Sequence, residues 1–295
     1  MDTRRLPYLV ELARLGSMRA VAETLQTSTS SVSQQIAALA HEAGVPLVEP
    51  DGRRVRLTPA GRRLAGHAVE ILAAVDSARH DLDPHGDPAG TVRVAGFATA
   101  VRRSLMPIVA AFADEHPRVR LTIREHEPTE ALALLDADAV DLALVYDYDL
   151  APSAITPPPS ALTRGPLWEA RWGLGVPGED APAVAGPAAA VVGAYRDHDW
   201  IGNSRNRADE DVERLLASTA GFEPRMTHEA DSLDLVEDLV VAGLGVGLLP
   251  VDRPVRPGVR VLELRDPQVR LRCRAVTRRG RASWPPLALV LGALR

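Results

Sequence analysis

Residues 27–35 read TSTSSVSQQ, and most of these side chains carry a hydroxyl or an amide group. At the start of a helix, small hydroxyl side chains let the backbone approach a polyanion, and the free N–H groups there can receive a phosphate. A glutamine can donate and accept at a base edge, with adenine as its best partner. The stretch therefore predicts a DNA-contacting helix tip, with the candidate residues Thr29, Ser30, Ser31, Ser33 and Gln34.

Helix capping is the simpler interpretation of the same stretch. Ser28 or Ser30 could accept a hydrogen bond from a free N–H group at the helix start, with its neighbours forming a polar turn. Capping accounts for one or two hydroxyl groups and leaves the others unexplained. We therefore favour DNA contact over capping alone.

The flanking sequence indicates three short helices that would position this tip. An apolar stripe over residues 6–15 stops at a glycine, and Ser17 can cap a second helix. A further apolar face recurs at positions 32, 36, 39 and 43, and Gly44 can end that third helix. Three short helices with a polar tip on the third are the helix-turn-helix arrangement.

The segment EPDGRRVRLTP (49–59) reads as a small hairpin around an Asp-Gly turn. Arg54 and Arg56 would share one face of its second strand, with Arg53 at the tip. A basic wing beside a recognition helix predicts contacts to phosphates or the minor groove. A solvated surface hairpin is the alternative, which the position directly after the third helix disfavours.

Charge is unevenly distributed along the 295 residues, whose formal net charge is -5. Residues 1–67 contain nine Arg and six acidic side chains, a net charge of +3, so the remainder carries -8. A basic head on an acidic body favours a polyanion as the partner of the head. Chance variation of surface charge is the alternative explanation.

Residues 59–82 are predicted to form one long helix, with Thr58 as its cap and Pro59 in its first turn. At 1.5 Å per residue the helix would extend about 35 Å. Its apolar residues repeat with heptad spacing, which favours a dimer seam over packing onto its own body. The seam positions are Leu64, Ala68, Ile71, Val75, Ala78 and Leu82. Residues 83–90, DPHGDPAG, read as a hinge.

From residue 91 the predicted strands and helices alternate, which indicates βαβ units and a mainly parallel sheet covered by helices on both faces. The proline-rich segment 151–166 interrupts the alternation and reads as a crossover to a second set of elements. We expect a two-lobed α/β clamshell. Residues 91–163 and 266–295 would form the first lobe, and residues 164–265 the second.

Ligands of such folds bind at the carboxyl ends of strands, where helix N-termini converge. Short polar groups recur at the predicted helix starts after successive strands, and this recurrence favours a pocket between the lobes. Each group could singly be an unliganded helix cap. The candidate effector-binding residues are Thr99, Ala100, Thr129, Asn203 and Ser232.

Sequence signatures of an enzyme or a metalloprotein are missing. The chain has no P-loop, GxSxG or HExxH motif, and its eight His show no metal-ligand spacing with the single cysteine, Cys273. GLGVG (243–247) lies between a helix and a strand, which is the wrong context for dinucleotide binding. We expect no catalytic residues, no metal and no cofactor. No apolar run approaches the roughly 20 residues of a membrane helix, so a soluble cytoplasmic protein is expected.

Two long stretches resemble the LysR-type transcriptional regulators. RLPYLVELARLGSMRAVAETLQTSTSSVSQQIAALAHEAGVPLVEPDGRRVRLTPAG (5–61) is similar to the family's amino-terminal winged domain in order, spacing and length. AGFEPRMTHEADSLDLVEDLVVAGLGVGLLP (220–250) is similar to the segment that enters, crosses and leaves the family's second effector-domain lobe.

The resemblance implies a winged helix-turn-helix head, a linker helix and a two-lobed effector domain like that of periplasmic binding proteins. It implies a homodimer or homotetramer, paired through the linker helices, that binds a palindromic promoter site. A small molecule in the interlobe cleft, for which a carboxylate is the family-level expectation, would change the spacing of the heads. Activation would use a contact with RNA polymerase, and repression would need occlusion alone.

The chain departs from the family pattern at the helix tip. Thr29-Ser30 stands where relatives usually have Gln-Pro, and Ser33-Gln34-Gln35 where Ser-Arg-Gln is common. The DNA preference is therefore expected to differ most at Gln34, with more of the affinity supplied by the wing arginines. A regulator of the same fold that responds to protein partners stays an alternative, whereas a solute-binding protein or an enzyme is disfavoured.

Overall fold

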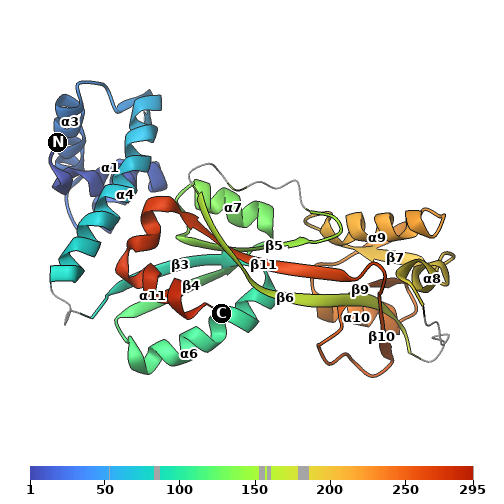
Figure 1. Ribbon diagram of the computed structural model, residues 1–295. Helices are drawn as coiled ribbons and strands as arrows, with labels where there is room; N and C mark the ends of the chain where they lie inside the picture. The colour runs from blue at the N-terminus through green and yellow to red at the C-terminus, as the bar shows by residue number, and fades with distance from the viewer. Residues whose placement is uncertain (53, 83–86, 153–156, 158–160, 179–185, 295) are drawn as a thin grey trace.

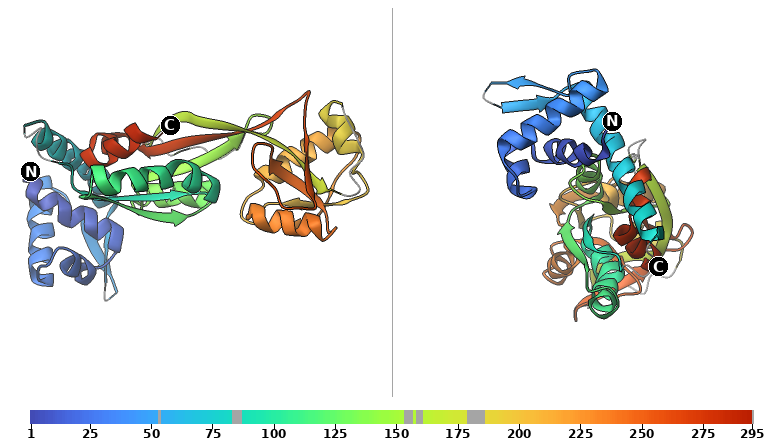
Figure 2. Two further views of the ribbon diagram at one scale, coloured as in Figure 1. Left: turned by 90° about the horizontal axis from the view of Figure 1, so that it is seen from below. Right: turned by 90° about the vertical axis from the view of Figure 1, so that its left-hand side faces the viewer.

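The computed structural model describes residues 1–52, 54–82, 87–152, 157, 161–178 and 186–294. A small helical head lies at one end, a long helix leaves it, and an elongated body of two lobes follows (Figure 1). Seen from below, the two lobes lie one after the other along the long axis, with the head beside the first (Figure 2).

The head contains three helices and a two-stranded hairpin. Their bounds are η1 Thr3–Arg5, α1 Leu6–Leu15, α2 Met18–Thr24, α3 Thr29–Ala43, β1 Val48–Asp51 and β2 Arg54–Leu57. Val32, Ile36 and Leu39 of α3 are buried against α1, as the helical spacing predicts. Gly44 ends α3 with φ of 70°, a left-handed conformation that glycine adopts at little cost.

Helix α4 spans Pro59–Leu82, the bounds predicted from the sequence, and the Thr58 hydroxyl accepts a hydrogen bond from the Gly61 N–H at 3.0 Å. One face, with Ala65, Val69 and Ala73, is buried against the chain itself. The first half of the predicted heptad seam also packs onto the chain itself, because Leu64, Ala68 and Ile71 contact the hydrophobic core of the head. Ala68 is buried, Leu64, Ile71 and Val75 are half-buried, and Ala78 and Leu82 are exposed.

The body contains one mixed sheet, to which nine strands belong among the described residues. The spatial order is β4-β3-β5-β11-β6-β9-β7-β8, and β10 pairs with β6. The strand bounds are β3 Gly90–Gly96, β4 Val119–Glu125, β5 Leu142–Tyr148, β6 Ala161–Pro177, β7 Asp199–Gly202, β8 Arg225–Glu229, β9 Val246–Pro250, β10 Val259–Glu263 and β11 Val269–Arg278.

The helices divide between the two lobes. The first lobe carries α5 Ala98–Ala100, the π-helical turn η2 Val101–Leu105, α6 Met106–Glu115, α7 Pro128–Asp136, η3 Arg279–Ser283 and α11 Pro285–Ala293. The second lobe carries α8 Ala188–Gly193, α9 Ala208–Thr219 and α10 Leu233–Val241 (Figure 1). One hydrophobic cluster, with Leu144 and Trp200 among its buried members, extends through both lobes.

The expectation of a mainly parallel sheet was wrong. β3 pairs with β4 and β5 in parallel, and β7 pairs with β8 and β9 in parallel. β11, however, is antiparallel to both β5 and β6, and β6 is antiparallel to β9 and β10. The reason is that β6 carries the chain out to the second lobe and β11 carries it back. Two such strands must run in opposite directions.

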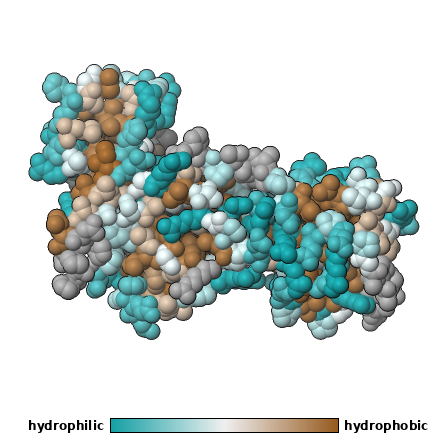
Figure 3. All heavy atoms as spheres, viewed as in Figure 1, coloured by the Kyte–Doolittle hydropathy of each residue, from teal (hydrophilic) through white to brown (hydrophobic). Residues whose placement is uncertain are grey.

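Two further features bear on function. Within the described ranges, no helix is long and apolar enough to cross a membrane. The face of the molecule in Figure 3 shows hydrophilic residues over the junction of the two lobes, and hydrophobic residues on the head toward its contact with the first lobe.

Helix α4 is fixed to the first lobe by close backbone packing at Gly280 in η3. A Cβ atom added to Gly280 would lie 2.4 Å from the Cβ and 2.8 Å from the Cα of Glu70. These atoms belong to or adjoin the helix backbone, so they cannot move aside as a side-chain end could. The contact therefore depends on glycine at this position.

We expect Gly280→Ala to lower the free energy of unfolding by about 1–3 kcal/mol, because it forces α4 and η3 apart. Chemical denaturation measures this change. Gly66→Ala is the matched control, since no atom lies within 4 Å of a Cβ at this position of the same helix. The control should be neutral or slightly stabilising. Equal behaviour of the two variants would contradict the proposed role of Gly280.

Candidate functional site

The tip of α3 presents polar side chains that the head does not use for its own packing. Ser28 caps the helix, its hydroxyl accepting a hydrogen bond from the Ser31 N–H at 3.1 Å. The hydroxyls of Ser28 and Ser30 are 2.8 Å apart. Thr29, Ser30 and Ser33 are exposed and Ser31 is half-buried. Capping thus occupies part of the hydroxyl cluster and leaves exposed hydroxyls beside it.

The two adjacent glutamines of α3 differ in their surroundings. Gln35 is half-buried, and its Oε1 accepts a hydrogen bond from Arg5 Nε at 3.2 Å, which ties α3 to the start of α1. Gln34 is exposed, and its side chain forms no hydrogen bond with the residues that the structure describes. Gln34 therefore has both its donor and its acceptor available to an external partner.

The predicted wing is present as the β1–β2 hairpin, with Glu49 opposite Arg56 in the register. Arg56 is 62% exposed, and its guanidinium lies 3.0 Å from the Glu49 carboxylate, which offsets its charge. Arg54 begins β2, and nothing is described of its side chain. Arg53 lies outside the described residues.

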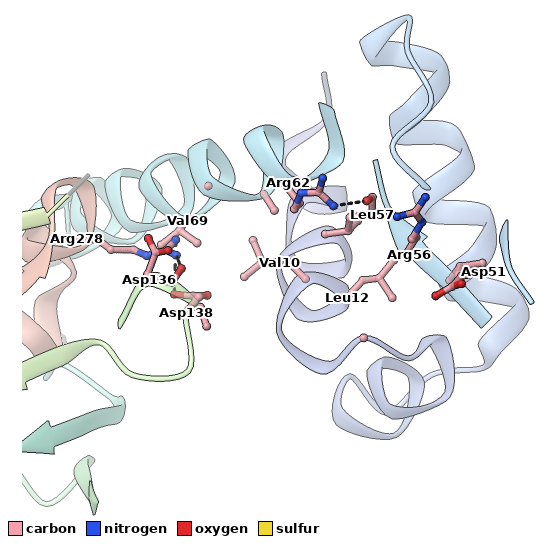
Figure 4. Close-up of a pocket in the computed structure, with 16 residues that line it drawn as sticks. Val10, Leu12, Asp51, Arg56, Leu57, Arg62, Val69, Asp136, Asp138 and Arg278 are labelled. Atoms are coloured by element: carbon pink, nitrogen blue, oxygen red, sulfur yellow. Dashed lines mark hydrogen bonds and ion pairs between the residues drawn. The ribbon is translucent and has the colours of Figure 1, made fainter. Parts of the chain in front are cut away.

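A groove of about 480 Å³ separates the head from the first lobe (Figure 4). Arg56 and Arg62 line it on the head side, and Asp136, Asp138 and Arg278 on the lobe side. Arg62 donates a hydrogen bond to the Leu57 carbonyl at 2.8 Å, and Arg278 donates to the carbonyl of Asp136. The polar groups of the groove thus largely form hydrogen bonds with other parts of its wall. None of the predicted effector residues lies there.

A second cavity, of about 260 Å³, lies between the two lobes. Four segments that follow parallel strands contribute to it, those after β3, β4, β7 and β8. This is where the carboxyl ends of strands meet in open α/β sheets. The lining residues are Phe97, Ala98, Thr99, Arg102, Glu125, Glu127, Tyr146, Tyr148, Trp172, Asn203, Asp209, Asp231, Ser232, Leu233, Asp234 and Leu271.

Three of the five sequence-predicted effector residues line this cavity: Thr99, Asn203 and Ser232. The other two were misplaced. Ala100 is fully buried in the hydrophobic core, because α5 turns it inward. Thr129 is exposed on α7 and does not line the cavity. Glu127, two residues earlier in the sequence, lines it instead.

Two buried carboxyl groups missing from the predicted set lie at the centre of the cavity wall. Tyr146 and Asn206 each donate a hydrogen bond to Glu127 Oε2 at 3.0 Å. Tyr148 donates to Asp209 Oδ1 at 2.7 Å. Burial raises the pKa of Glu127 to about 7 and that of Asp209 to about 6. Both groups therefore titrate near neutral pH.

Arg205, in the segment between β7 and α9, bridges the lobes at the edge of the cavity. Its Nε lies 3.0 Å from Asp231 Oδ2 within the second lobe. Its terminal nitrogens lie 3.7 Å from Glu125, 3.8 Å from Glu127 and 3.7 Å from Glu130 of the first lobe. The hydrogen bond from Asn206 to Glu127 also joins the lobes. These polar contacts thus join the two lobes beside the cavity.

Cys273 lies in β11 and is fully buried. Burial raises the pKa of its thiol to about 12, so the reactive thiolate form is scarce at neutral pH. In the part of the chain that the structure describes, no group of three or more His, Cys, Asp or Glu side chains is placed to hold a metal ion. The chemistry of the cavity is therefore that of hydrogen bonds, carboxylates and aromatic rings.

Comparison with known families matches nearly the whole chain. A model described as a bacterial regulatory helix-turn-helix protein of the lysR family matches residues 3–62. A model described as the LysR substrate binding domain matches residues 85–295. Residues 63–84, which include most of α4, lie between the two matches.

Two curated relatives are transcriptional regulators as well. The transcriptional dual regulator GltC of Bacillus subtilis is 29% identical, over 85% of this chain and 81% of its own length. CysB of Haemophilus influenzae is 25% identical, over 84% of this chain and 75% of its own length.

Two solved structures share the fold. Full-length OxyR from Pseudomonas aeruginosa superposes with a TM-score of 0.73 at 22% identity, over 100% of this chain and 96% of its own. The structure of CbnR in complex with its target DNA superposes with a TM-score of 0.54 at 21% identity, over 100% of this chain and 99% of its own. With the helix-turn-helix head and the two-lobed α/β body in place, the chain belongs to the LysR family of transcriptional regulators.

Proposed function

We propose that this regulator reads promoter DNA with the tip of α3 and the wing, and that a small molecule in the interlobe cavity controls the placement of its heads. The DNA-contacting residues of the proposal are Thr29, Ser30, Ser31, Ser33, Gln34, Arg53, Arg54 and Arg56. Thr99, Asn203 and Ser232 are its effector-contacting residues among those that the sequence suggested.

The observation that carries the DNA-reading role is the contrast between the two glutamines of α3. Gln35 is engaged by Arg5 inside the head, whereas Gln34 is exposed with its amide uncommitted. An exposed amide at the start of a recognition helix can donate to N7-side acceptors and accept from the amino group of adenine. Thr29 and Ser33, small and exposed on the same tip, are suited to phosphate contacts.

The proposed assembly is a homodimer or homotetramer paired through α4. Support comes from the carboxyl-terminal half of the α4 seam, where Val75 is half-buried and Leu82 is exposed, on a face distinct from the one buried against η3. Leu82 is 87% exposed, although leucine favours burial. A second copy of the same helix would cover this stripe with heptad packing.

The proposed division of the chain follows from these roles. Residues 1–58 read DNA, residues 59–82 pair the protomers, and residues 83–90 act as the hinge. Residues 91–163 with 266–295, and residues 164–265, form the two effector lobes.

The effector acts by favouring one lobe arrangement over another, since a ligand shifts an equilibrium only through its differential affinity for the two states. Contact with RNA polymerase would then activate transcription, and occlusion of the promoter would repress it.

A cavity with convergent polar groups favours a small molecule over a protein partner as the signal. The cavity of about 260 Å³ is close to the lower range of known ligand pockets. A protein partner would need an exposed surface and would not require an enclosed space between the lobes.

For DNA reading, we expect Gln34→Ala to weaken binding at a cognate duplex by about 1–3 kcal/mol, because one bidentate base contact is lost. Binding to a random duplex should not change. Cognate sites can be identified by mapping bound sites across the genome, and affinities measured by fluorescence anisotropy.

Gln35→Ala is the matched control for Gln34→Ala. It removes the hydrogen bond to Arg5 within the head and should therefore change the affinities for cognate and random duplexes by the same factor. An equal loss on both duplexes for Gln34→Ala would refute the base-reading role of Gln34.

For assembly, we expect Val75→Asp to weaken protomer association at least tenfold, because pairing would bury an uncompensated carboxylate, at a cost of roughly several kcal/mol. Sedimentation velocity over a concentration series measures this change. Arg63→Asp places the same carboxylate at an exposed position of α4 outside the seam and should leave association unchanged. Unaltered association of Val75→Asp would show that the protomers pair elsewhere.

A further inference from the structure

Aromatic side chains are scarce in this chain and are concentrated at the interlobe cavity. The sequence contains four Trp, four Tyr and three Phe, and Phe97, Tyr146, Tyr148 and Trp172 all line the cavity. The rings contact one another in series, with centroids 4.7 Å apart for Phe97 and Tyr146 and 5.7 Å apart for Tyr148 and Trp172. A wall of this kind offers π-faces and edges to a ligand.

The same cavity is strongly acidic. Glu125, Glu127, Asp209, Asp231 and Asp234 line it, against one basic residue. Two of these acids are already neutralised, because Asp231 pairs with Arg205 and Asp234 pairs with Arg253. Glu125 is exposed to water. The charges that need an explanation are therefore the two buried ones.

Glu127 and Asp209 are deeply buried, with 6% and 8% of their surface exposed. Both hydrogen bonds to Glu127 end on Oε2, and the nearest cation to Oε1 is Arg205 Nη2 at 3.8 Å. Asp209 is bonded to neutral groups of Tyr148 and Asn203, and in the described ranges no basic side chain lies within ion-pair distance of it. Asp209 is thus a buried carboxylate without a cation, which is costly, and Glu127 has the longer contact to Arg205 alone.

Trp172 supplies an independent indication of a ligand. It lines the cavity with 6% of its surface exposed, and its indole N–H has no hydrogen-bond acceptor among the described residues. Buried polar groups normally have partners. An unused donor on a residue that lines the cavity is accounted for when a bound molecule supplies the acceptor.

We infer that the effector is a small organic cation, an amine or guanidinium compound, whose charge lies between Glu127 and Asp209 against the aromatic wall. This inference rests on the proposed role of the cavity as the effector site. Carboxylates neutralise such a charge, and aromatic faces attract it electrostatically. The Trp172 indole N–H and Arg102 would serve an acceptor group elsewhere on the ligand.

The acidic lining disfavours a ligand whose sole charged group is a carboxylate, the class expected from the family resemblance. Such a ligand would meet one favourable charge, that of Arg102, and the repulsion of the buried acids. The aromatic wall in turn disfavours a hydrated metal ion, which would take oxygen ligands on all sides.

The effector's affinity should depend on pH, because a cation binds to the ionised carboxylates and must displace their protons. Burial is the main reason why the pKa of Glu127 is raised to about 7, and Asp231 and Asp209 raise it further while Tyr146 and Arg205 oppose them. The pKa of Asp209 is raised to about 6 by burial and by Asp231, opposed by Tyr148 and Asn203. Ionisation of Glu127 alone gives an increase in cation affinity of about tenfold between pH 6 and pH 8.

The test uses matched pairs of probes on the full chain, by isothermal titration calorimetry. n-Butylguanidine is compared with the uncharged n-butylurea of the same shape, and L-lysine with L-norleucine, whose side chain is uncharged, while glutarate represents the carboxylates. We expect at least one charged member to bind ten times more tightly than its neutral partner, with the pH dependence given above. Equal binding within both pairs, or binding of glutarate alone, would overturn the inference.

Variants then locate the charge within the cavity. Glu127→Gln and Asp209→Asn should each reduce the preference for the charged probe to less than threefold, and Glu127→Gln should also remove most of the pH dependence. Thr129→Ala, at the same helix start but outside the cavity, is the matched control and should keep the preference. An undiminished preference in both acid variants would place the cation elsewhere.

Failure of the inference can be told from failure of the proposed function. Binding of glutarate that is weakened by Ser232→Ala would keep the cavity as the effector site and change the class of ligand. If no probe binds, the cation inference fails, and unaltered sequence-specific binding of DNA by the same preparation would keep the DNA-reading role. Because the probe pairs are compared on the unaltered chain, the main result does not depend on the folding of any variant.

Discussion

The antiparallel pairing of β6 with β11 is the constraint on which the arrangement of the body depends. Their register runs from Val269 opposite Trp172 to Arg278 opposite Ala161, with one irregularity between. β11 also pairs with β5 of the first lobe, and β6 pairs with β9 of the second. The two strands therefore hold both lobes in one sheet. They leave a cavity at their junction, and bending of this pair would change the separation of the cavity walls.

The head was largely predictable from the sequence because its determinants are local. Caps, a terminal glycine and apolar residues at helical spacing gave the three helices, and an Asp-Gly turn gave the hairpin. The direction of the strands in the body was not predictable in the same way. Whether a strand returns antiparallel depends on its distant partners, as with β10 (Val259–Glu263), which pairs with β6 much earlier in the chain.

In the cavity, too, the residues with a local sequence signal were predictable and the others were not. Thr99, Asn203 and Ser232 were recognisable as short polar residues after predicted strands, a signal carried by the sequence around each of them. Tyr146 and Tyr148 looked like ordinary members of a buried strand, and Asp209 like an acid in the first turn of a helix. Their common role depends on distances between residues 61 or more positions apart. Alternate aromatic positions of a strand, facing one side, were the available signal.

The distribution of buried charge gives the cavity a way to couple ligand binding to lobe position. Glu127 belongs to the first lobe and Asp209 to the second, and each lacks a closely bonded cation. When both are ionised they repel each other, which favours separation of the lobes, and Arg205 and Asn206 oppose that separation from the rim. A cation between the two carboxylates would replace repulsion with attraction on both sides. Its binding energy would then depend on the distance between the lobes, which is the differential affinity that an effector needs in order to act.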